Sequence, residues 1–589
     1  MRVSTAGHQL PGNPDKIAAL QQRHGTVEER RRALWTRFPK WRERTLDQLL
    51  ADVAREYPDR PFVVTDDRTW SYRQVLDWSE RLARGLFAAG VRPGDHVALL
   101  MANYAEFVAV KFAISRVGAV AVPINFLNRR DELGYALQQS DAVLLITMDR
   151  FRDLDYLSFL DELAPDWESQ GGGTAFFRLK KVVVFRTSAE ALRSGVTLLD
   201  TLGEGAPPLP PFVHPGPKTN SDIIYTSGTT GSPKGVMLTH DMMLRTAFGS
   251  TYGRAFEDGR RILFSLPMYH VYGYVEGLLA CMFVGGSIVP QLKFDAVGTL
   301  EGVVRHRATD ILLIPTMTLA LLDELRRVHY DLSHLHAVIS SGGRSPSYIW
   351  EQIFEWFKPA ELTTGYGMTE VTASSTVTAP DDPLERLLNS NGRLRDVGPS
   401  GDTGHGGHLV RYRVVDPESG AVLAPGAMGE LQAQGMGVTA GYYNKPEATA
   451  QAFTSDGWLH TGDLGTMDAD GYLRLMGRIK ESYRCGGEQV LPTEAEDLLV
   501  THPAVLQAHV VPVPDERMGE VGVAYIVRRV GASVSAEELT NFCATHLARF
   551  KVPRHVLFIE AADIPSTPSG RARKFLLVRM AMDALGLQG

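Results

Sequence analysis

The sequence predicts an α/β protein with a large, layered N-terminal domain and a small α+β C-terminal domain. Its 589 residues exceed one ordinary domain. Short apolar stretches alternate with amphipathic ones through most of the chain, which is typical of largely parallel sheets covered by helices. After Gly477 a smaller unit begins, with its own strands and helix. We therefore divide the chain into an N-terminal extension (residues 1–44), a main domain (45–477) and a C-terminal lid domain (478–589).

Composition narrows the class of protein. Hydrophobic residues make up 44% and charged residues 22% of the chain, as in ordinary globular proteins. The formal net charge of −7 gives no bulk attraction to nucleic acid or to an acidic membrane surface. Cys281, Cys485 and Cys543 lie far apart, so we expect neither a disulfide framework nor a zinc site. The N-terminus lacks a signal-peptide core, and the most apolar run, 277–290, is too short for a bilayer. These features predict a cytoplasmic protein.

The elements of the main domain follow from local patterns. Residues 1–44 are polar, with basic clusters at Arg30–Arg32 and Lys40–Arg44. We expect a solvated arm and helix laid on the body of the protein, with a partner-binding segment as the alternative. Leucines and Val53 recur at helical spacing from Leu46 onward, and a second helix over 75–89 ends at Gly90. The predicted strands are 61–64, 97–101, 119–124, 142–146, 222–225, 262–266, 311–314 and 337–340. Residues 163–176, with three consecutive glycines, read as a loop, and the proline-rich stretch 204–219 reads as a linker. In the lid domain we expect strands at 508–511 and 522–526 and a helix over 537–547.

A glycine-rich loop over residues 225–235 follows one of these strands. Gly228, Gly231 and Gly235 let the backbone approach a ligand closely. The loop also carries hydroxyl donors and one cation, which are Ser227, Thr229, Thr230 and Lys234. Successive N–H groups in such a loop form a concave nest for anions, so the loop suits a polyphosphate. Its spacing fails the Walker A pattern, because a glycine follows the lysine.

The loop resembles the signature of the adenylate-forming enzymes, a family of acyl-CoA ligases, luciferases and peptide-synthetase adenylation domains. Four further motifs follow in family order, at residues 267–273, 364–370, 458–463 and 477–480, so the resemblance covers about residues 45–580. It implies an acyl-CoA ligase that uses ATP, Mg²⁺ and coenzyme A and passes through an acyl-adenylate, with AMP as the leaving group. The apolar and aromatic residues near Val271 imply a hydrophobic carboxylic acid, whether fatty, aryl or polycyclic.

The resemblance also implies roles for single residues. His270 would line the acyl pocket, and Glu370 would hold Mg²⁺. Tyr366 would pack on adenine and Thr369 would touch the α-phosphate, while Asp463 and Arg478 would bind the ribose. Lys480 would be the hinge about which the lid domain swings, and Gly486 and Gly487 would admit the pantetheine arm of CoA. The full predicted cofactor-binding set is Thr226, Ser227, Gly228, Thr229, Thr230, Gly231, Lys234, Gly343, Arg344, Gly365, Tyr366, Gly367, Thr369, Asp463, Arg478, Gly486 and Gly487.

Two departures from the family pattern change the functional prediction. Arg571 stands where the family has the lysine that bridges the substrate carboxylate and the α-phosphate during adenylation, and arginine does not replace a catalytic point charge conservatively. Lys574 could substitute only if the chain bends there. Arg344 replaces a small residue beside adenine; it either narrows the pocket, contacts a new anion or extends to solvent.

We therefore predict an acyl-CoA ligase with impaired or absent adenylation, which transfers a preformed acyl group from its adenylate to CoA. A separate adenylating ligase would then supply the adenylate. The alternatives are an ordinary two-step ATP-dependent synthetase, in which Arg571 or Lys574 suffices, and a pseudoenzyme that binds nucleotide without turnover. A homodimer is compatible with the sequence, and we expect neither nucleic acid nor membrane as a partner.

Overall fold

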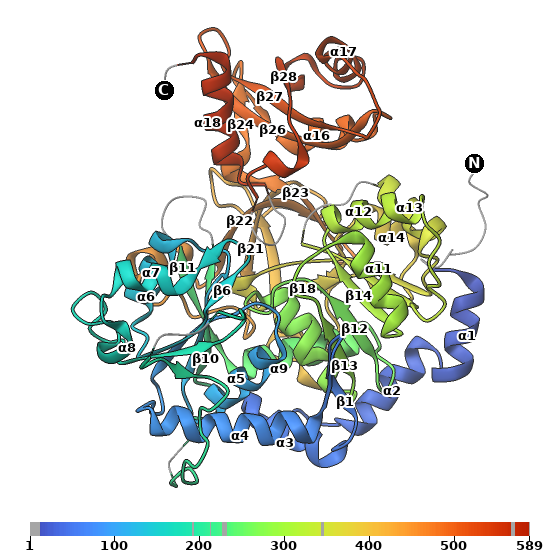
Figure 1. Ribbon diagram of the computed structural model, residues 1–589. Helices are drawn as coiled ribbons and strands as arrows, with labels where there is room; N and C mark the ends of the chain where they lie inside the picture. Colours follow the sequence, from blue (N-terminus) through green and yellow to red (C-terminus); the bar gives the residue numbers. More distant parts are fainter. Residues whose placement is uncertain are drawn as a thin grey trace.

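The computed structural model describes residues 12–190, 194–211, 214–226, 233–342, 347–566 and 572–587. It has a large part below and a small part above, the latter built from the C-terminal residues (Figure 1). Two seven-stranded sheets form the centre of the large part, and one five-stranded sheet forms the small part. The predicted α/β fold with a large N-terminal and a small C-terminal domain is confirmed, and the boundary at residue 477 stays a prediction.

The first large sheet has the order β16-β15-β14-β12-β13-β1-β2 and is parallel except at β2. The second has the order β11-β10-β4-β3-β5-β8-β9 and is parallel except at β11. The strands are β1 (Pro61–Val64), β2 (Thr69–Ser71), β3 (His96–Leu100), β4 (Val120–Pro123), β5 (Leu144–Met148), β8 (Lys181–Phe185), β9 (Thr197–Leu198), β10 (Asn220–Thr226), β11 (Lys234–Thr239), β12 (Arg261–Phe264), β13 (Ser287–Pro290), β14 (Asp310–Leu313), β15 (Ala337–Ser340) and β16 (Glu361–Thr363). Because helices cover both faces, the inner strands are buried at most positions, and β4 and β14 at every position.

Smaller sheets and hairpins complete the molecule. They use β6 (Arg150–Phe151) with β7 (Leu154–Asp155), β17 (Gly365–Met368) with β18 (Ala373–Val377) and β19 (Arg393–Leu394), and β20 (Arg411–Val415), β21 (Gly429–Gln434), β22 (Leu459–Met467) and β23 (Leu473–Arg478). The small domain contains β24 (Tyr483–Cys485), β25 (Glu488–Val490), β26 (Val505–Asp515), β27 (Gly519–Arg528) and β28 (His555–Phe558). These sheets are largely antiparallel, so the molecule mixes both kinds of sheet.

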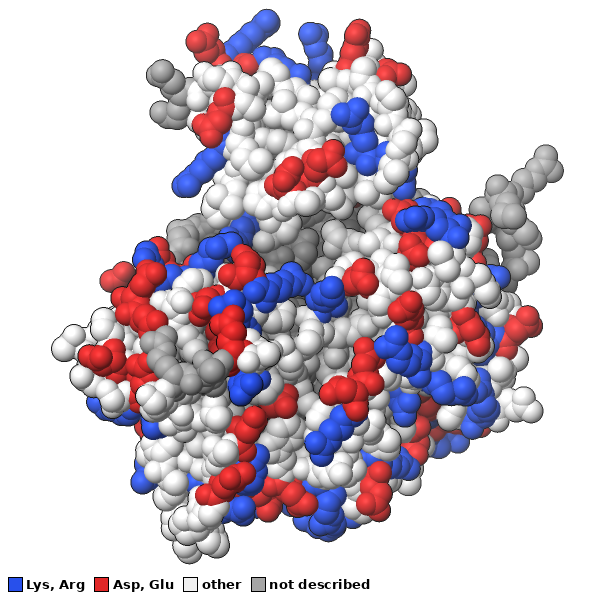
Figure 2. Space-filling model, viewed as in Figure 1, with Lys and Arg blue, Asp and Glu red and all other residues white. Residues whose placement is uncertain are grey.

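The helices are α1 (Pro14–His24), α2 (Val27–Arg37), α3 (Leu46–Glu56), α4 (Tyr72–Ala88), α5 (Ala105–Arg116), α6 (Arg130–Ser140), α7 (Tyr156–Leu163), α8 (Trp167–Gln170), α9 (His240–Gly253), α10 (Ala280–Met282), α11 (Ala296–Arg305), α12 (Pro315–Leu325), α13 (Ser347–Trp356), α14 (Leu384–Asn389), α15 (Pro446–Ala452), α16 (Pro492–Leu499), α17 (Ala536–His546) and α18 (Lys574–Leu585). Among the described residues, no helix is both long and apolar enough to cross a bilayer. On the face drawn in Figure 2, acidic and basic side chains are interspersed, so no field of a single sign covers it.

Helix α4 begins earlier than its hydrophobic spacing predicts. The predicted start was Val75, but Ser71 caps the helix and accepts a hydrogen bond from the Gln74 backbone at 3.3 Å. The Gln74 side chain accepts in return from the Ser71 backbone at 2.9 Å, which completes a capping box. The end near Gly90 agrees with the prediction, since this residue has a φ of +100°.

The loop predicted over residues 163–176 contains a short helix, α8, so that prediction is wrong at Trp167–Gln170. The Trp167 indole is buried, and its Nε1 donates to Asp161 Oδ1 at 2.9 Å. Burial of one large aromatic side chain anchors this turn despite the three glycines that follow it.

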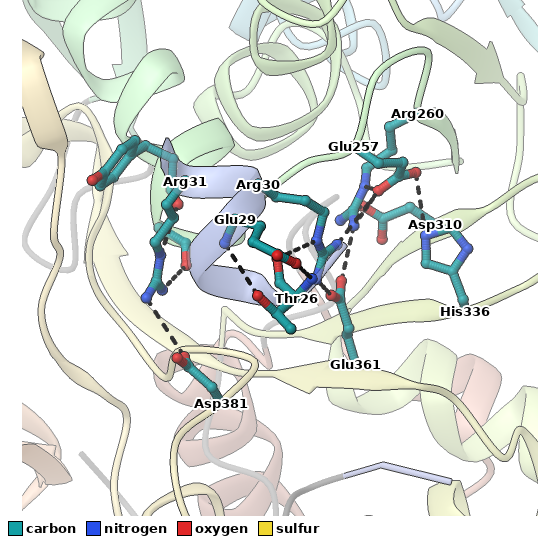
Figure 3. A network of polar contacts seen from close by, with 12 residues as sticks. Thr26, Glu29, Arg30, Arg31, Glu257, Arg260, Asp310, His336, Glu361 and Asp381 are labelled. Atoms are coloured by element: carbon teal, nitrogen blue, oxygen red, sulfur yellow. Dashed lines mark hydrogen bonds and ion pairs between the residues drawn. The ribbon is translucent and has the colours of Figure 1, made fainter. Parts of the chain in front are cut away.

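The N-terminal extension has a helix that lies on the large domain, as predicted, but the prediction of a solvated segment is wrong for Arg30. Helix α2 carries the Arg30 side chain into the large domain, where only 5% of the residue is exposed (Figure 3). There it pairs with Glu361 of β16 and lies 3.8 Å from Glu257 Oε2. Arg260 bridges the same two carboxylates, at 2.7 Å from Glu257 and 2.8 Å from Glu361. We call these residues, together with Arg254, Asp310 and His336, the buried charge cluster.

Candidate active site

The predicted ribose-binding residues meet at one carboxylate. β22 and β23 pair in a register that places Asp463 opposite Arg478. Arg478 Nε lies 2.8 Å from Asp463 Oδ1, and the Tyr366 hydroxyl donates to Asp463 Oδ2 at 2.6 Å. Asp463 is only 3% exposed, and Tyr366 reaches it from β17, 97 residues earlier in the chain. The structure thus brings together three residues that the sequence analysis assigned to one nucleoside.

The predicted metal ligand lies beside the cation of the phosphate loop. Glu370 is 7% exposed, and its Oε1 accepts a hydrogen bond from the Tyr442 hydroxyl at 3.0 Å. Lys234, at the start of β11, places its Nζ 4.8 Å from the centre of the same Tyr442 ring. Burial raises the pKa of Glu370. The hydrogen bond from Tyr442 and the positive charge of Arg478 lower this pKa and so offset part of the rise. The sequence analysis missed Tyr442 because nothing in its local sequence points to a carboxylate 72 residues away.

Glu370 fits a Mg²⁺ site of the kind that is completed by substrate. Its buried carboxylate is a hard oxygen ligand, and the neighbouring Lys234 suits a phosphate. Among the residues that the structure describes, no group of three or more His, Cys, Asp and Glu side chains could hold a metal. An ion at Glu370 would therefore take most of its ligands from phosphate oxygens and water, and it would neutralise charge on the phosphates.

His270 lies two residues before the start of a π-helix, η1 (Tyr272–Leu279). Such helices are rare and occur frequently at functional sites. The His270 Nδ1 accepts from the Tyr272 backbone N–H at 3.3 Å, and burial lowers the pKa of His270 to about 4. Asn103 holds the preceding turn, donating to Leu266 O at 3.0 Å and accepting from Met268 N at 2.8 Å. His270 is thus a neutral imidazole on a fixed turn, which suits the wall of an acyl pocket better than a cationic site.

The C-terminal segment brings two cations to different places. Lys574 Nζ lies 2.7 Å from Glu496 Oε1 and 3.4 Å from Glu481 Oε2, and these carboxylates raise its pKa. Lys574 is therefore held inside the small domain. Arg573 lies near the buried Tyr269, the residue before His270. Burial raises the pKa of the Tyr269 phenol, and the positive charge of Arg573 offsets part of that rise. The sequence analysis singled out neither Tyr269 nor Arg573, since only tertiary structure brings these two residues near each other.

The remaining predicted residues are placed in part. Thr226 ends β10, Gly365 and Gly367 lie in β17, and Thr369 is buried directly before Glu370. Lys480 lies in a short 3₁₀ turn, η5 (Ile479–Glu481), directly after β23. Gly486 and Gly487 form the turn between β24 and β25 with φ of +61° and +88°, a conformation that favours glycine. Ser227, Gly228, Thr229, Thr230, Gly231, Gly343, Arg344 and Arg571 lie outside the described residues.

Comparison with known families settles the class to which these motifs belong. A family model described as "AMP-binding enzyme" matches residues 50–443, and one described as "AMP-binding enzyme C-terminal domain" matches residues 494–571. The chain belongs to the AMP-binding enzyme family. The predicted resemblance to adenylate-forming enzymes is thereby confirmed at the level of the family.

Individual relatives of this AMP-binding enzyme are named as CoA ligases or synthetases. It is 35% identical to the putative acyl-CoA synthetase YngI of Bacillus subtilis, over 92% of this chain and 98% of the relative. It is 31% identical to 3-[(3aS,4S,7aS)-7a-methyl-1,5-dioxo-octahydro-1H-inden-4-yl]propanoyl:CoA ligase of Mycobacterium tuberculosis, over 90% and 98% of the two chains. Its structure matches that of the anthranilate CoA ligase AuaEII in complex with anthranoyl-AMP, with a TM-score of 0.81 and 25% identity over 93% and 99% of the two chains.

Replacing Asp463 with alanine is expected to weaken AMP binding by roughly 10²-fold, because the ribose would lose a charged acceptor and Arg478 would lose its partner. Calorimetric titration of AMP measures this change. Asp456→Ala is the matched control, since Asp456 pairs with Arg413 at an exposed position. Equal AMP affinity in the wild type and Asp463→Ala would contradict the assignment of Asp463 to the nucleoside.

Two histidines, the buried His240 and the partly buried His270, predict that the fold loses stability in acid. Burial lowers the pKa of His270 to about 4 and that of His240 to about 3, whereas an unfolded histidine titrates near 6.5. Below about pH 6.5 the unfolded chain therefore binds protons that the folded chain does not, so stability falls as the pH falls toward these values. We expect the melting temperature to drop between pH 6.5 and pH 4 and to drop less in His240→Asn. Identical pH profiles of the two proteins would contradict the prediction for His240.

Proposed function

We propose that this AMP-binding enzyme forms acyl-CoA thioesters mainly from preformed acyl-adenylates, and that it adenylates free acids weakly or not at all. The proposal is carried by two observations on the cations at and near the position of the family's adenylating lysine. Arg571 occupies that position in the sequence, and the nearby Lys574 is already bound by Glu496 and Glu481. A lysine held by two carboxylates is not free to bridge a substrate carboxylate and a phosphate.

The groups that would hold an acyl-adenylate support the same proposal. Asp463 forms an ion pair with Arg478 and a hydrogen bond with Tyr366, and these three residues together suit the nucleoside. Neutral His270 and the π-helix after it suit a hydrophobic acyl group. One structure similar to this chain, that of the anthranilate CoA ligase AuaEII, is a complex with an acyl-adenylate, anthranoyl-AMP. These residues would bind the acyl-adenylate even if the step that makes it is weak.

The proposed reaction needs little covalent chemistry from the protein. The CoA sulfur, as thiolate, attacks the acyl carbonyl carbon, the bond from that carbon to the phosphate oxygen breaks, and AMP leaves with the electron pair. The thiol proton goes to solvent. The chain would orient the two reactants and stabilise the charge that develops on the carbonyl and the departing phosphate. Lys234, the lysine of the phosphate loop, would serve the AMP phosphate.

A paired assay tests the proposal with the unmodified protein. One arm supplies free acid, ATP, Mg²⁺ and CoA, and the other supplies the synthetic acyl-adenylate and CoA, over one panel of fatty, aryl and polycyclic acids. We expect thioester in the second arm and little or none in the first. Comparable product in both arms would return the protein to the ordinary two-step synthetases. No product in either arm, with AMP binding retained, would favour the pseudoenzyme.

A further inference from the structure

A segment between β21 and β22, residues 439–443, joins β11 to the predicted metal ligand. Residues 441–443 lie along β11: the Met237 N–H donates to Gly441 O at 3.2 Å, and the Tyr443 N–H donates to Gly235 O at 2.8 Å. Tyr442 forms an antiparallel bridge with Val236 between these two bonds. The segment therefore extends the sheet at the strand that carries Lys234.

The same segment is hydrogen-bonded to the 3₁₀ turn η2 (Thr369–Val371), which carries Glu370. The Thr439 N–H donates to Glu370 O at 2.8 Å, and the Thr439 hydroxyl donates to Met237 O at 2.7 Å. Glu370 and β11 are thus fixed to one another through a few residues of a third segment. The side chain that completes this connection is Tyr442.

Tyr442 contacts the two charged groups in different ways. Its hydroxyl donates to Glu370 Oε1 at 3.0 Å, which fixes the direction of that carboxylate. Its ring face lies 4.8 Å from Lys234 Nζ, within range of a cation–π interaction. The Tyr442 backbone N–H is held in turn by the Thr449 hydroxyl at 3.0 Å. A single, anchored side chain therefore contacts one carboxylate and one ammonium group.

We propose that Tyr442 is the positioning residue that aligns Glu370 and Lys234 on one Mg²⁺–phosphate group. The Tyr442 hydroxyl would orient the Glu370 carboxylate, and the Tyr442 ring would position the Lys234 ammonium group. This inference rests on the assignment of Glu370 to Mg²⁺ and of Lys234 to phosphate, and it does not depend on how fast the enzyme adenylates. Hydrogen-bond partners of metal ligands commonly contribute 10- to 100-fold to metal affinity.

Two variants separate the roles of the hydroxyl and the ring. Tyr442→Phe keeps the ring and is expected to raise the Mg²⁺ concentration for half-maximal stimulation of ATP binding by about tenfold, while AMP affinity without metal stays unchanged. Tyr442→Leu removes both groups and is expected to weaken AMP binding as well, by roughly three- to tenfold. Both affinities are measured by calorimetry on the full-length protein, so no turnover is required.

The neighbouring Tyr443→Phe is the matched control. Its hydroxyl donates to Asp141 Oδ2 at 3.0 Å, away from Glu370, so this variant is expected to bind Mg²⁺ and AMP as the wild type does. Unchanged melting temperatures would show that the variants remain folded. Equal Mg²⁺ dependence in the wild type and Tyr442→Phe would overturn the proposal, and so would an equal loss of AMP affinity in Tyr442→Phe and Tyr442→Leu. If the paired assay showed ordinary adenylation, the expected binding results for Tyr442 would not change. A failure of the proposed function can therefore be distinguished from a failure of the proposal for Tyr442.

Discussion

Replacing Arg571 with lysine is expected to raise the rate of adenylate formation from the free acid by roughly 10²- to 10³-fold. That range is the usual cost of losing one preorganised donor to developing charge. A lysine presents a compact ammonium group on a flexible stem, whereas the guanidinium is a wider planar fork with a different reach. Exchange of pyrophosphate into ATP in the presence of the acid measures the first step alone.

Thioester formation, the second step of the reaction, is the internal reference for Arg571→Lys. Thioester formation from the synthetic adenylate is expected to be the same in the wild type and Arg571→Lys, because the lysine would act during adenylation only. Arg579→Lys, at an exposed position of α18, makes the same chemical exchange elsewhere in the small domain and is expected to alter neither step. A wild type that already exchanges pyrophosphate as fast as Arg571→Lys would show that arginine suffices.

Replacing Arg30 with alanine is expected to lower the free energy of unfolding by about 3–5 kcal/mol. The change leaves Glu361 and Glu257 of the buried charge cluster with one cation fewer, and an uncompensated buried charge is costly. Glu361 begins β16, only a few residues before the Gly365–Tyr366 motif, so we expect AMP affinity to fall along with stability. Urea unfolding and AMP titration on the same preparation measure both effects.

Arg32→Ala is the matched control for Arg30→Ala, since both residues belong to one run of three arginines on α2. The Arg32 side chain is 69% exposed and pairs with Glu28 at 3.0 Å on the helix surface. Exposed pairs of this kind contribute little to stability, so we expect the melting temperature of this variant to match the wild type. Similar losses in the two variants would indicate a general dependence on helix charge and would contradict the special role of Arg30.

Sequence patterns predicted the strands of the large domain well, because these strands are buried on both faces. Residues 61–64 and 337–340, for example, are apolar or small throughout and form β1 and β15 at the predicted bounds. Element ends were less predictable where side chains decide them, as Ser71 does for α4 and Trp167 for α8. In both places a single polar or aromatic side chain outweighs the average pattern.

The residues of the candidate site likewise fall into those that the sequence predicted and those that it could not. Tyr366, Asp463 and Arg478 were assigned from separate motifs, and the structure brings them into one group. Tyr442 and Arg30 could not be predicted, because their local sequences are those of a turn and of a solvated helix. What fixes their roles is a partner far away in the chain, Glu370 in one case and Glu361 in the other.

The position of Arg30 has a consequence for the order in which the chain is made and folded. Its partner Glu361 follows 331 residues later, so at ordinary translation rates of about 5–20 residues per second it is synthesised roughly 15–65 s after Arg30. Until then α2 has no carboxylate of β16 to receive its guanidinium, and burying that charge alone would be unfavourable. We therefore expect α2 to dock late, although it is synthesised well before β16, and a nascent chain arrested before residue 361 to leave α2 accessible to protease.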